Sequence, residues 1–173
     1  SGFDRYKLLK FQEKKIFLSK NNLRYKKIIG IGAWGFDYFF GKYYDNFAQN
    51  FIDNFGQDQF DMHRDDLGHL QKIYREIIKN NTDILFVLRY HPGTTDYKKN
   101  EFFGLEQFEN VFVSNKFTNT GYQISDLINI ADFWIGYETT TALEAWLLGK
   151  QTFLINPTRR DFIRENVHKG SPI

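Results

Sequence analysis

Three consecutive threonines, Thr139, Thr140 and Thr141, stand between a short apolar run, "DFWIG", and a segment with the composition of a helix. A helix that begins here presents unpaired backbone N–H groups and the positive end of its dipole at its first turn. Hydroxyl donors beside those N–H groups make an anion site that needs no lysine. The sequence therefore predicts that this segment, the threonine turn (residues 139–141), holds a phosphate group.

A purely structural role accounts for one of the three threonines. Thr141 is followed three residues later by Glu144, which is the spacing of a capping box. Capping of this kind leaves Thr139 and Thr140 unexplained, and propensity does not favour β-branched residues at a helix start. Glu144 has a second use open to it, because its carboxylate could accept hydrogen bonds from both hydroxyls of a ribose.

A second candidate group lies in "RYHPG", at the end of an apolar run. Pro92 restricts His91 to extended geometry, so that His91 should project into the crevice beyond the carboxyl end of a strand, where α/β sheets bind ligands. A loop histidine without a ligand is the alternative. Arg89, in the same segment, is an accessory candidate.

Gly30, Gly32 and Gly35 have the G-x-G-x-x-G spacing directly after the apolar run "KKIIGIG". This glycine turn (residues 30–35) formally matches a dinucleotide fingerprint. The second strand of such a unit, with its acidic ribose ligand about 20 residues onward, is replaced here by an aromatic helix and a polar segment. We therefore prefer a tight turn whose N–H groups, at Gly32 and Ala33, approach a phosphate.

The segment "DMHRDDLGHL" superficially resembles a metal cluster, with His63, Asp65, Asp66 and His69 as ligands. The two histidines are six residues apart, and Asp65 or Asp66 is well placed to cap the helix that follows. We therefore expect no metal site.

The elements that position these groups follow from the hydrophobic pattern. Strands are expected at "KKIIGIG", "DILFVLR", "NVFVS", "DFWIG" and "QTFLI". Helices are expected from Phe40 to Phe55 with Asp37 as N-cap and Gly56 at its end, from Leu67 to Ile78, and at "QISDLINIA", "TALEAWLLGK" and "RRDFIREN". Apolar strands joined by helical crossovers predict a doubly wound α/β fold, with a mostly parallel sheet covered by helices on both faces.

Composition narrows the class of protein. The chain has 173 residues, 42% of them hydrophobic, which suits one domain with a sizeable core. A net charge of +2 does not argue for nucleic acid, and the absence of cysteine excludes disulfides and thiolate metal sites. We expect residues 1–26 to be a linker or N-terminal extension, in which a short helix leads into one domain at 27–173, and the whole to be a fragment of a larger protein.

"RYHPG" and, further along, "DLINIADFWIGYETTTALEAWLLGKQTFLINPTRRDF" resemble the C-terminal, donor-binding half of GT-B glycosyltransferases of bacterial surface polysaccharide synthesis. The similarity is to capsule and lipopolysaccharide transferases with a His-Pro motif and a later Ser/Thr-rich motif, and to teichoic acid glycerophosphotransferases. It covers approximately residues 27–166. The resemblance implies a Rossmann-like, nucleotide-sugar-binding half of a GT-B fold, with a CMP-, CDP- or UDP-linked sugar as donor and no cofactor.

The resemblance also implies roles for residues. His91 and the threonine turn would hold the nucleotide and its phosphates, Glu144 would bind the ribose, and the glycine turn would face the same crevice. Glu138 stands where many relatives have Asp or Gly, and it joins Arg89 as an accessory candidate. The catalytic base is expected outside this chain, in an N-terminal acceptor-binding domain.

The implied partners are a nucleotide-sugar donor and a glycan or lipid-linked acceptor, without nucleic acid. The implied location is the cytoplasm, with peripheral association at the cytoplasmic face of the inner membrane as a further option. Three alternatives stay open: a UDP-N-acetylglucosamine 2-epimerase-like domain, a non-catalytic nucleotide-binding module, and an NAD-type dinucleotide-binding domain. "ETTTALEAW" fits the transferase form better than the glycine-rich epimerase form.

Overall fold

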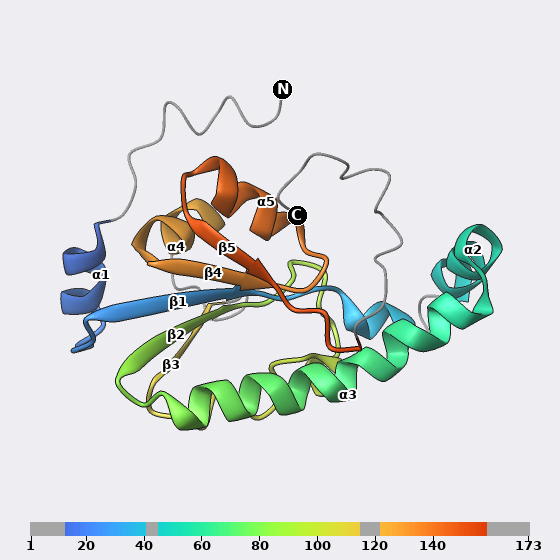
Figure 1. The fold of residues 1–173 in the computed structure, drawn as a ribbon, viewed down its shortest axis with the longest axis horizontal. Coiled ribbons are helices and arrows are strands. Elements are labelled where there is room, and N and C mark those ends of the chain that lie inside the picture. The colour runs from blue at the N-terminus through green and yellow to red at the C-terminus, as the bar shows by residue number, and fades with distance from the viewer. Residues whose placement is uncertain (1–12, 41–44, 115–121, 159–173) are drawn as a thin grey trace.

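The computed structural model describes residues 13–40, 45–114 and 122–158. Five parallel strands form one sheet in the order β3-β2-β1-β4-β5. The strands are β1 (Lys27–Gly32), β2 (Ile84–Arg89), β3 (Val111–Ser114), β4 (Phe133–Gly136) and β5 (Gln151–Leu154). Helices cover both faces of the sheet (Figure 1), so the predicted doubly wound, Rossmann-like α/β fold is confirmed.

Both faces of the central strands are buried, which explains their continuous apolar sequences. Leu85 and Val87 of β2 pack on one face, and Phe86 and Leu88 pack on the other. The register brings three strand ends to one level, because Gly32 pairs with Arg89 of β2 and with Gly136 of β4. The segments that follow β1, β2 and β4 therefore start at the same edge of the sheet.

One long helix, α3 (Gln57–Asn80), covers the face that lies below the sheet in Figure 1. Its apolar stripe packs against alternate residues of β1 and β2. On the other face lie α1 (Lys14–Lys20), α4 (Ile124–Ile130) and α5 (Thr140–Leu147). The core between α3 and the sheet contains Leu70, Tyr74, Ile78, Ile31 and Phe86. The core on the other face contains Phe17, Leu127, Ala142, Leu85 and Trp134.

The helix predicted from Phe40 to Phe55 does not include Phe40, which lies at the end of a 3-10 helix, and it is confirmed from residue 45 onward; residues 41–44 lie outside the described residues. A short 3-10 helix, η2 (Phe36–Phe39), comes first, and α2 (Asp45–Phe55) follows. Asp37 caps neither helix, because its buried Oδ2 accepts hydrogen bonds from the N–H and the hydroxyl of Thr95, at 2.7 and 3.0 Å. Gly56 does end α2, as predicted, with a φ of +89° that favours glycine.

The start of α3 also differs from the prediction. The helix begins at Gln57 rather than after the polar segment, so Asp65 and Asp66 lie inside it and cap nothing. Two polar residues on its inner side, His63 and Asp66, are buried there with Phe60. The hydrophobic pattern did not reveal the first turns of α3, because polar residues on their buried side have hydrogen-bond partners elsewhere in the chain.

The remaining elements agree with the sequence. Helices α4 and α5 lie where they were predicted, and a further 3-10 turn, η4 (Tyr97–Lys99), lies in the loop after β2. The short helix expected before the first strand is α1, whose Phe17 ring packs on the rings of Phe112 and Tyr122, with centroids 5.0 and 5.1 Å apart. The helix predicted at "RRDFIREN" lies outside the described residues. None of the described helices has the length and apolarity to cross a membrane.

Candidate functional site

The glycine turn and the threonine turn lie at the point where the topology reverses. From β1 the chain passes to α3 on one face, and from β4 it passes to α5 on the opposite face. β1 and β4 are neighbours in the sheet. Open α/β sheets bind ligands in the crevice outside the carboxyl ends of two such strands. The two turns thus occupy the default binding position of this fold.

The two turns are in direct contact. The Thr139 hydroxyl donates a hydrogen bond to the carbonyl oxygen of Ala33, at 3.4 Å. Gly32 lies so close to Thr141 that a Cβ at position 32 would collide with the Thr141 hydroxyl. The Ala33 N–H, which was predicted to approach a phosphate, instead donates to the carbonyl of Arg89, at 2.8 Å. The structure therefore brings four predicted site residues of the two turns together.

The helix cap is Thr139, and the predicted capping box of Thr141 with Glu144 is wrong. Thr139 has extended backbone angles, and its Oγ1 accepts from the Thr141 N–H at 3.4 Å. Thr141 lies in the first turn of α5, where its Oγ1 accepts from Nε1 of Trp134, at 3.0 Å. The indole of Trp134 is fully buried and needs an acceptor, which explains this use of Thr141.

Thr140 differs from its two neighbours because its side chain is exposed. Its hydroxyl makes no hydrogen bond to other described residues, whereas the Thr139 and Thr141 hydroxyls are 3.2 Å apart and engaged with the protein. Thr140 is the first residue of α5, where the helix dipole favours an anion. Of the three threonines, Thr140 is therefore the one whose hydroxyl is available to a ligand.

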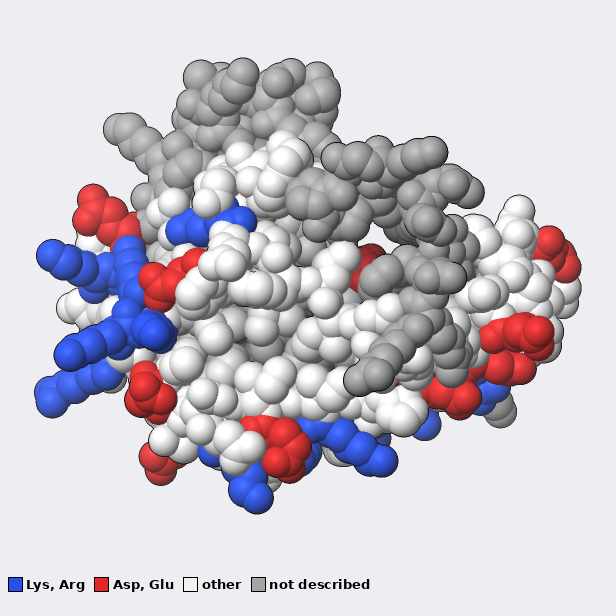
Figure 2. Space-filling view, in the orientation of Figure 1, with Lys and Arg blue, Asp and Glu red and all other residues white. Residues whose placement is uncertain are grey.

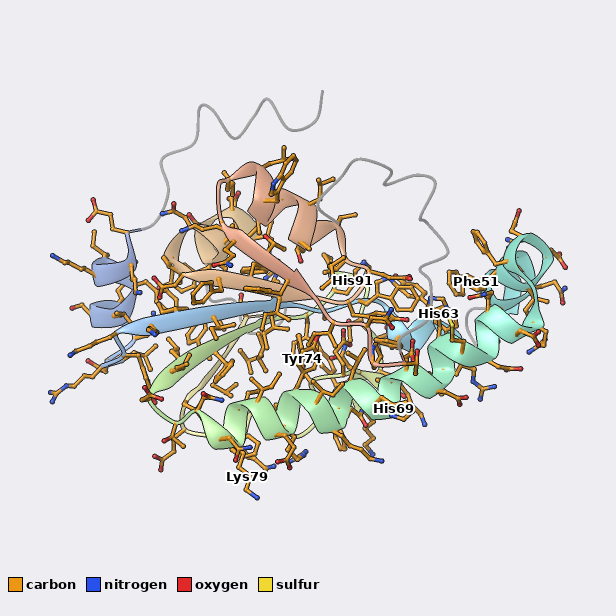
Figure 3. The ribbon with its side chains drawn as sticks, in the orientation of Figure 1. Phe51, His63, His69, Tyr74, Lys79 and His91 are labelled. Atoms are coloured by element: carbon orange, nitrogen blue, oxygen red, sulfur yellow. The ribbon has the colours of Figure 1, made fainter. Side chains whose placement is uncertain are left out.

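His91 lies at the carboxyl end of the sheet (Figure 3), beside the glycine turn. Its Nδ1 accepts a hydrogen bond from the Gly93 N–H at 3.1 Å, so the ring proton of the neutral form is on Nε2. The edge of the Tyr38 ring packs against it, with centroids 5.9 Å apart. The half-buried ring thus has a fixed tautomer that makes Nε2 a donor.

The other predicted residues have distinct surroundings. The Arg89 guanidinium donates to the Ser114 hydroxyl at 3.2 Å, on the side of β2 away from the threonine turn. Burial lowers the pKa of Arg89 below its usual value. Glu144 lies one turn into α5 and is half-buried. The Glu138 carboxylate turns toward the protein interior, where its Oε2 lies 3.2 Å from Nε2 of His63.

The four residues of the metal alternative do not converge. His63 is fully buried and faces Glu138, whereas His69, about 1.7 turns later on α3, is exposed (Figure 3). Asp65 is exposed, and Asp66 accepts from the Tyr137 hydroxyl at 2.8 Å. The described part of the chain holds no group of three or more side chains arranged for a metal ion.

Glu101 is a buried residue next to the candidate site. The sequence did not predict a role for it. Its Oε1 accepts the backbone N–H of Trp34, in the glycine turn, at 2.6 Å, and its Oε2 is buried without a partner among the described residues. Desolvation raises the pKa of Glu101 to about 8, against the lowering effect of the Trp34 hydrogen bond. Glu101 stands in a loop without periodicity, so the sequence offered no signal for it.

One group of basic side chains lies away from the two turns. On the face shown in Figure 2, lysines and arginines gather over α1 and the start of β1, at the opposite end of the strands from the two turns. Arg24, Lys26 and Lys27 line a surface hollow there together with Asp83 and Glu109. The candidate groups for a ligand among the described residues are the Thr140 hydroxyl at the start of α5, the His91 imidazole and the Glu144 carboxylate, and none of them is a lysine.

No protein-family model matches the sequence, and no curated protein matches it at a significant level. Among solved structures, the chain is similar to Thermosulfurimonas dismutans KpsC, a beta Kdo 2,4 transferase, with a TM-score of 0.45 and 13% sequence identity. The similarity covers 78% of this chain and 35% of that chain, so this chain spans about a third of the length of that protein.

Proposed function

We propose that the chain is the donor nucleotide-sugar-binding half of a GT-B glycosyltransferase that acts in bacterial surface polysaccharide synthesis, of capsule or lipopolysaccharide. The observation that carries the proposal is the contact between the glycine turn and the threonine turn at the carboxyl ends of β1 and β4. This is the position at which open α/β sheets bind nucleotides. The His-Pro segment starts at the same edge of the sheet.

The roles within the site divide according to the hydrogen bonds. Thr140, with its exposed hydroxyl at the first position of α5, binds a phosphate of the donor, and the helix dipole adds to this attraction. Nε2 of His91 donates a second hydrogen bond to the nucleotide. Thr139 and Thr141 hold the two turns together, and Glu144 binds the ribose.

The chemistry of this half is electrostatic. When the bond between the sugar and the nucleotide breaks, negative charge develops on the departing phosphate. Hydroxyl, imidazole and backbone dipoles that already point to that charge stabilise it without reorganisation. The catalytic base and the acceptor, a glycan or a lipid-linked sugar, belong to an N-terminal domain outside this chain.

A thermal-shift screen with CMP, CDP, UDP, GDP and NAD tests the proposal. At 100 times its dissociation constant a ligand adds about 2.7 kcal/mol to the free energy of unfolding, which raises the melting temperature measurably. We expect at least one of the three pyrimidine nucleotides to stabilise the chain. Stabilisation by NAD alone, or by none of the five compounds, would contradict the proposal.

A further inference from the structure

We infer that His63 and Glu138 form a positioning pair that holds the threonine turn against the glycine turn, without contacting the nucleotide themselves. The pair joins α3 to the residue that directly precedes the cap of α5. The two side chains are 0% and 8% exposed. Its effect on ligand binding rests on the proposed function, whereas its effect on the two turns does not.

The hydrogen bonds around His63 define the pair. Nδ1 lies 2.7 Å from the carbonyl oxygen of Gln59, which only accepts, so Nδ1 carries a proton. Nε2 lies 3.2 Å from Oε2 of the Glu138 carboxylate, within hydrogen-bond distance. Both ring nitrogens are thus engaged, and the imidazole has one orientation.

Aromatic rings fix the plane of the imidazole. The Trp34 ring stacks on His63 with centroids 5.0 Å apart and planes 23° apart. The Phe39 ring also lies nearly parallel to it, with centroids 5.5 Å apart and planes 13° apart. Because Trp34 belongs to the glycine turn, His63 contacts that turn through its ring, and through Nε2 it contacts Glu138, the residue before the threonine turn.

These contacts close a circuit around the two turns. Thr139 donates to the carbonyl of Ala33, Ala33 is bonded to Trp34, Trp34 stacks on His63, and His63 bonds to Glu138, which precedes Thr139. A circuit of this kind fixes the position of each turn relative to the other in two places. One place is a hydrogen bond within the site, and the other is the buried pair.

The backbone of Glu138 gives independent support. Its φ is +37°, in the left-handed region that glycine prefers and that costs other residues about 1 kcal/mol or more. Such a conformation persists where the surroundings determine it. At Glu138 the surroundings are the buried hydrogen bond to His63, so the pair sets the direction in which the chain enters α5. The N–H groups of the first turn of α5 depend on that direction.

Three substitutions separate positioning from a general loss of structure. His63→Phe keeps a ring in contact with Trp34 and Phe39 and removes the hydrogen bonds to Glu138 and to the carbonyl of Gln59. Glu138→Ala removes the bond between His63 and Glu138 from the other side, whereas Glu138→Gln retains it, because the amide can donate to the unprotonated Nε2 of neutral His63. His69→Phe is the matched control, because His69 is the exposed histidine of the same helix.

Two readouts on the full chain test the pair. The first is the dissociation constant of the pyrimidine nucleotide that stabilises the wild type most, and the second is hydrogen exchange of residues 32–35 and 137–141 without ligand. For His63→Phe and Glu138→Ala we expect affinity to fall about tenfold and exchange in both segments to rise. Glu138→Gln and His69→Phe should match the wild type in both measurements.

The outcomes distinguish this inference from the proposed function. If Glu138→Gln loses as much affinity as Glu138→Ala, the carboxylate contacts the ligand and the inference is wrong. If exchange in residues 32–35 is unchanged in Glu138→Ala, the pair does not couple the turns. If the wild type binds no nucleotide while exchange rises as expected, the proposed function fails and the positioning pair stands.

Discussion

Gly32 and Thr141 meet where β1 and β4 end, with no room for a methyl group between them. A Cβ at position 32 would collide with the Thr141 hydroxyl, which already accepts from Trp134. We predict that Gly32→Ala lowers the free energy of unfolding by about 1–3 kcal/mol, because the threonine turn must move away. Urea denaturation measures the change.

Gly68→Ala is the matched control for that substitution. Gly68 lies on the exposed side of α3, and a Cβ there would have no neighbour within 4 Å. Alanine is favoured over glycine inside a helix, so this variant should gain up to about 1 kcal/mol. Equal effects of the two substitutions would show that the contact between Gly32 and Thr141 does not limit the space at β1.

Loss of the Thr140 hydroxyl should affect ligand binding, whereas loss of the Thr139 hydroxyl should affect stability. Thr140→Ala should weaken pyrimidine nucleotide binding about tenfold and leave the melting temperature of the free protein unchanged, because the hydroxyl is exposed. Thr139→Ala should lower the free energy of unfolding by about 1–2 kcal/mol, because it removes the cap of α5. Calorimetric titration and thermal melts check both results. A loss of stability in Thr140→Ala together with a loss of binding alone in Thr139→Ala would contradict the roles proposed for the two threonines.

The acceptor at Thr141 can be removed without a change in shape. Thr141→Val leaves the buried Nε1 of Trp134 without a partner, and we expect a loss of about 1–3 kcal/mol in the free energy of unfolding. Thr141→Ser keeps the hydroxyl and should recover most of that loss. Urea denaturation followed by tryptophan fluorescence measures both variants, and similar losses in the two would argue against the indole hydrogen bond.

Glu101 should make stability depend on pH. Desolvation raises its pKa from the usual 4.5 to about 8, so the folded protein holds a proton that the unfolded chain has released. The stability contributed by the neutral acid is complete below pH 4.5 and is lost as the pH rises to about 8. Within that window the free energy of unfolding should fall by about 1.4 kcal/mol per pH unit.

The comparison with Glu101→Gln isolates this contribution. The amide oxygen can still accept from the Trp34 N–H, and the side chain carries no charge at any pH. The difference in free energy of unfolding between wild type and variant, measured in urea at pH 5, 6, 7, 8 and 9, should therefore change with pH and level off above 8. Parallel profiles would mean that Glu101 does not stay protonated in the fold.

The fold was largely predictable because its strands are buried on both faces. A strand such as β2 then reads as a continuous apolar run, and the helices between such runs follow from their spacing. The first turns of α3 were not predictable, because His63 and Asp66 are polar and are buried through Glu138 and Tyr137, which lie far away in the sequence.

The position of the candidate site could be predicted from the sequence, but the roles of its individual residues could not. The edge rule for parallel sheets was enough to expect the glycine turn beside the threonine turn. Which threonine caps the helix depends on Trp134, whose buried indole takes the Thr141 hydroxyl as its acceptor. The spacing of residues in the sequence does not show that Trp134 donates to the Thr141 hydroxyl. It also does not show that Glu101 is buried.

The hydrogen bond between Thr139 and Ala33 joins residues that are 106 positions apart in the chain. A contact of such range forms slowly, because the entropy of closing the intervening loop must be lost first. During synthesis, the glycine turn leaves the ribosome long before its counterpart exists. The contact between the two turns is therefore one of the last features of the molecule to form, and a chain that ends before α5 would have four of the five strands without the complete threonine turn.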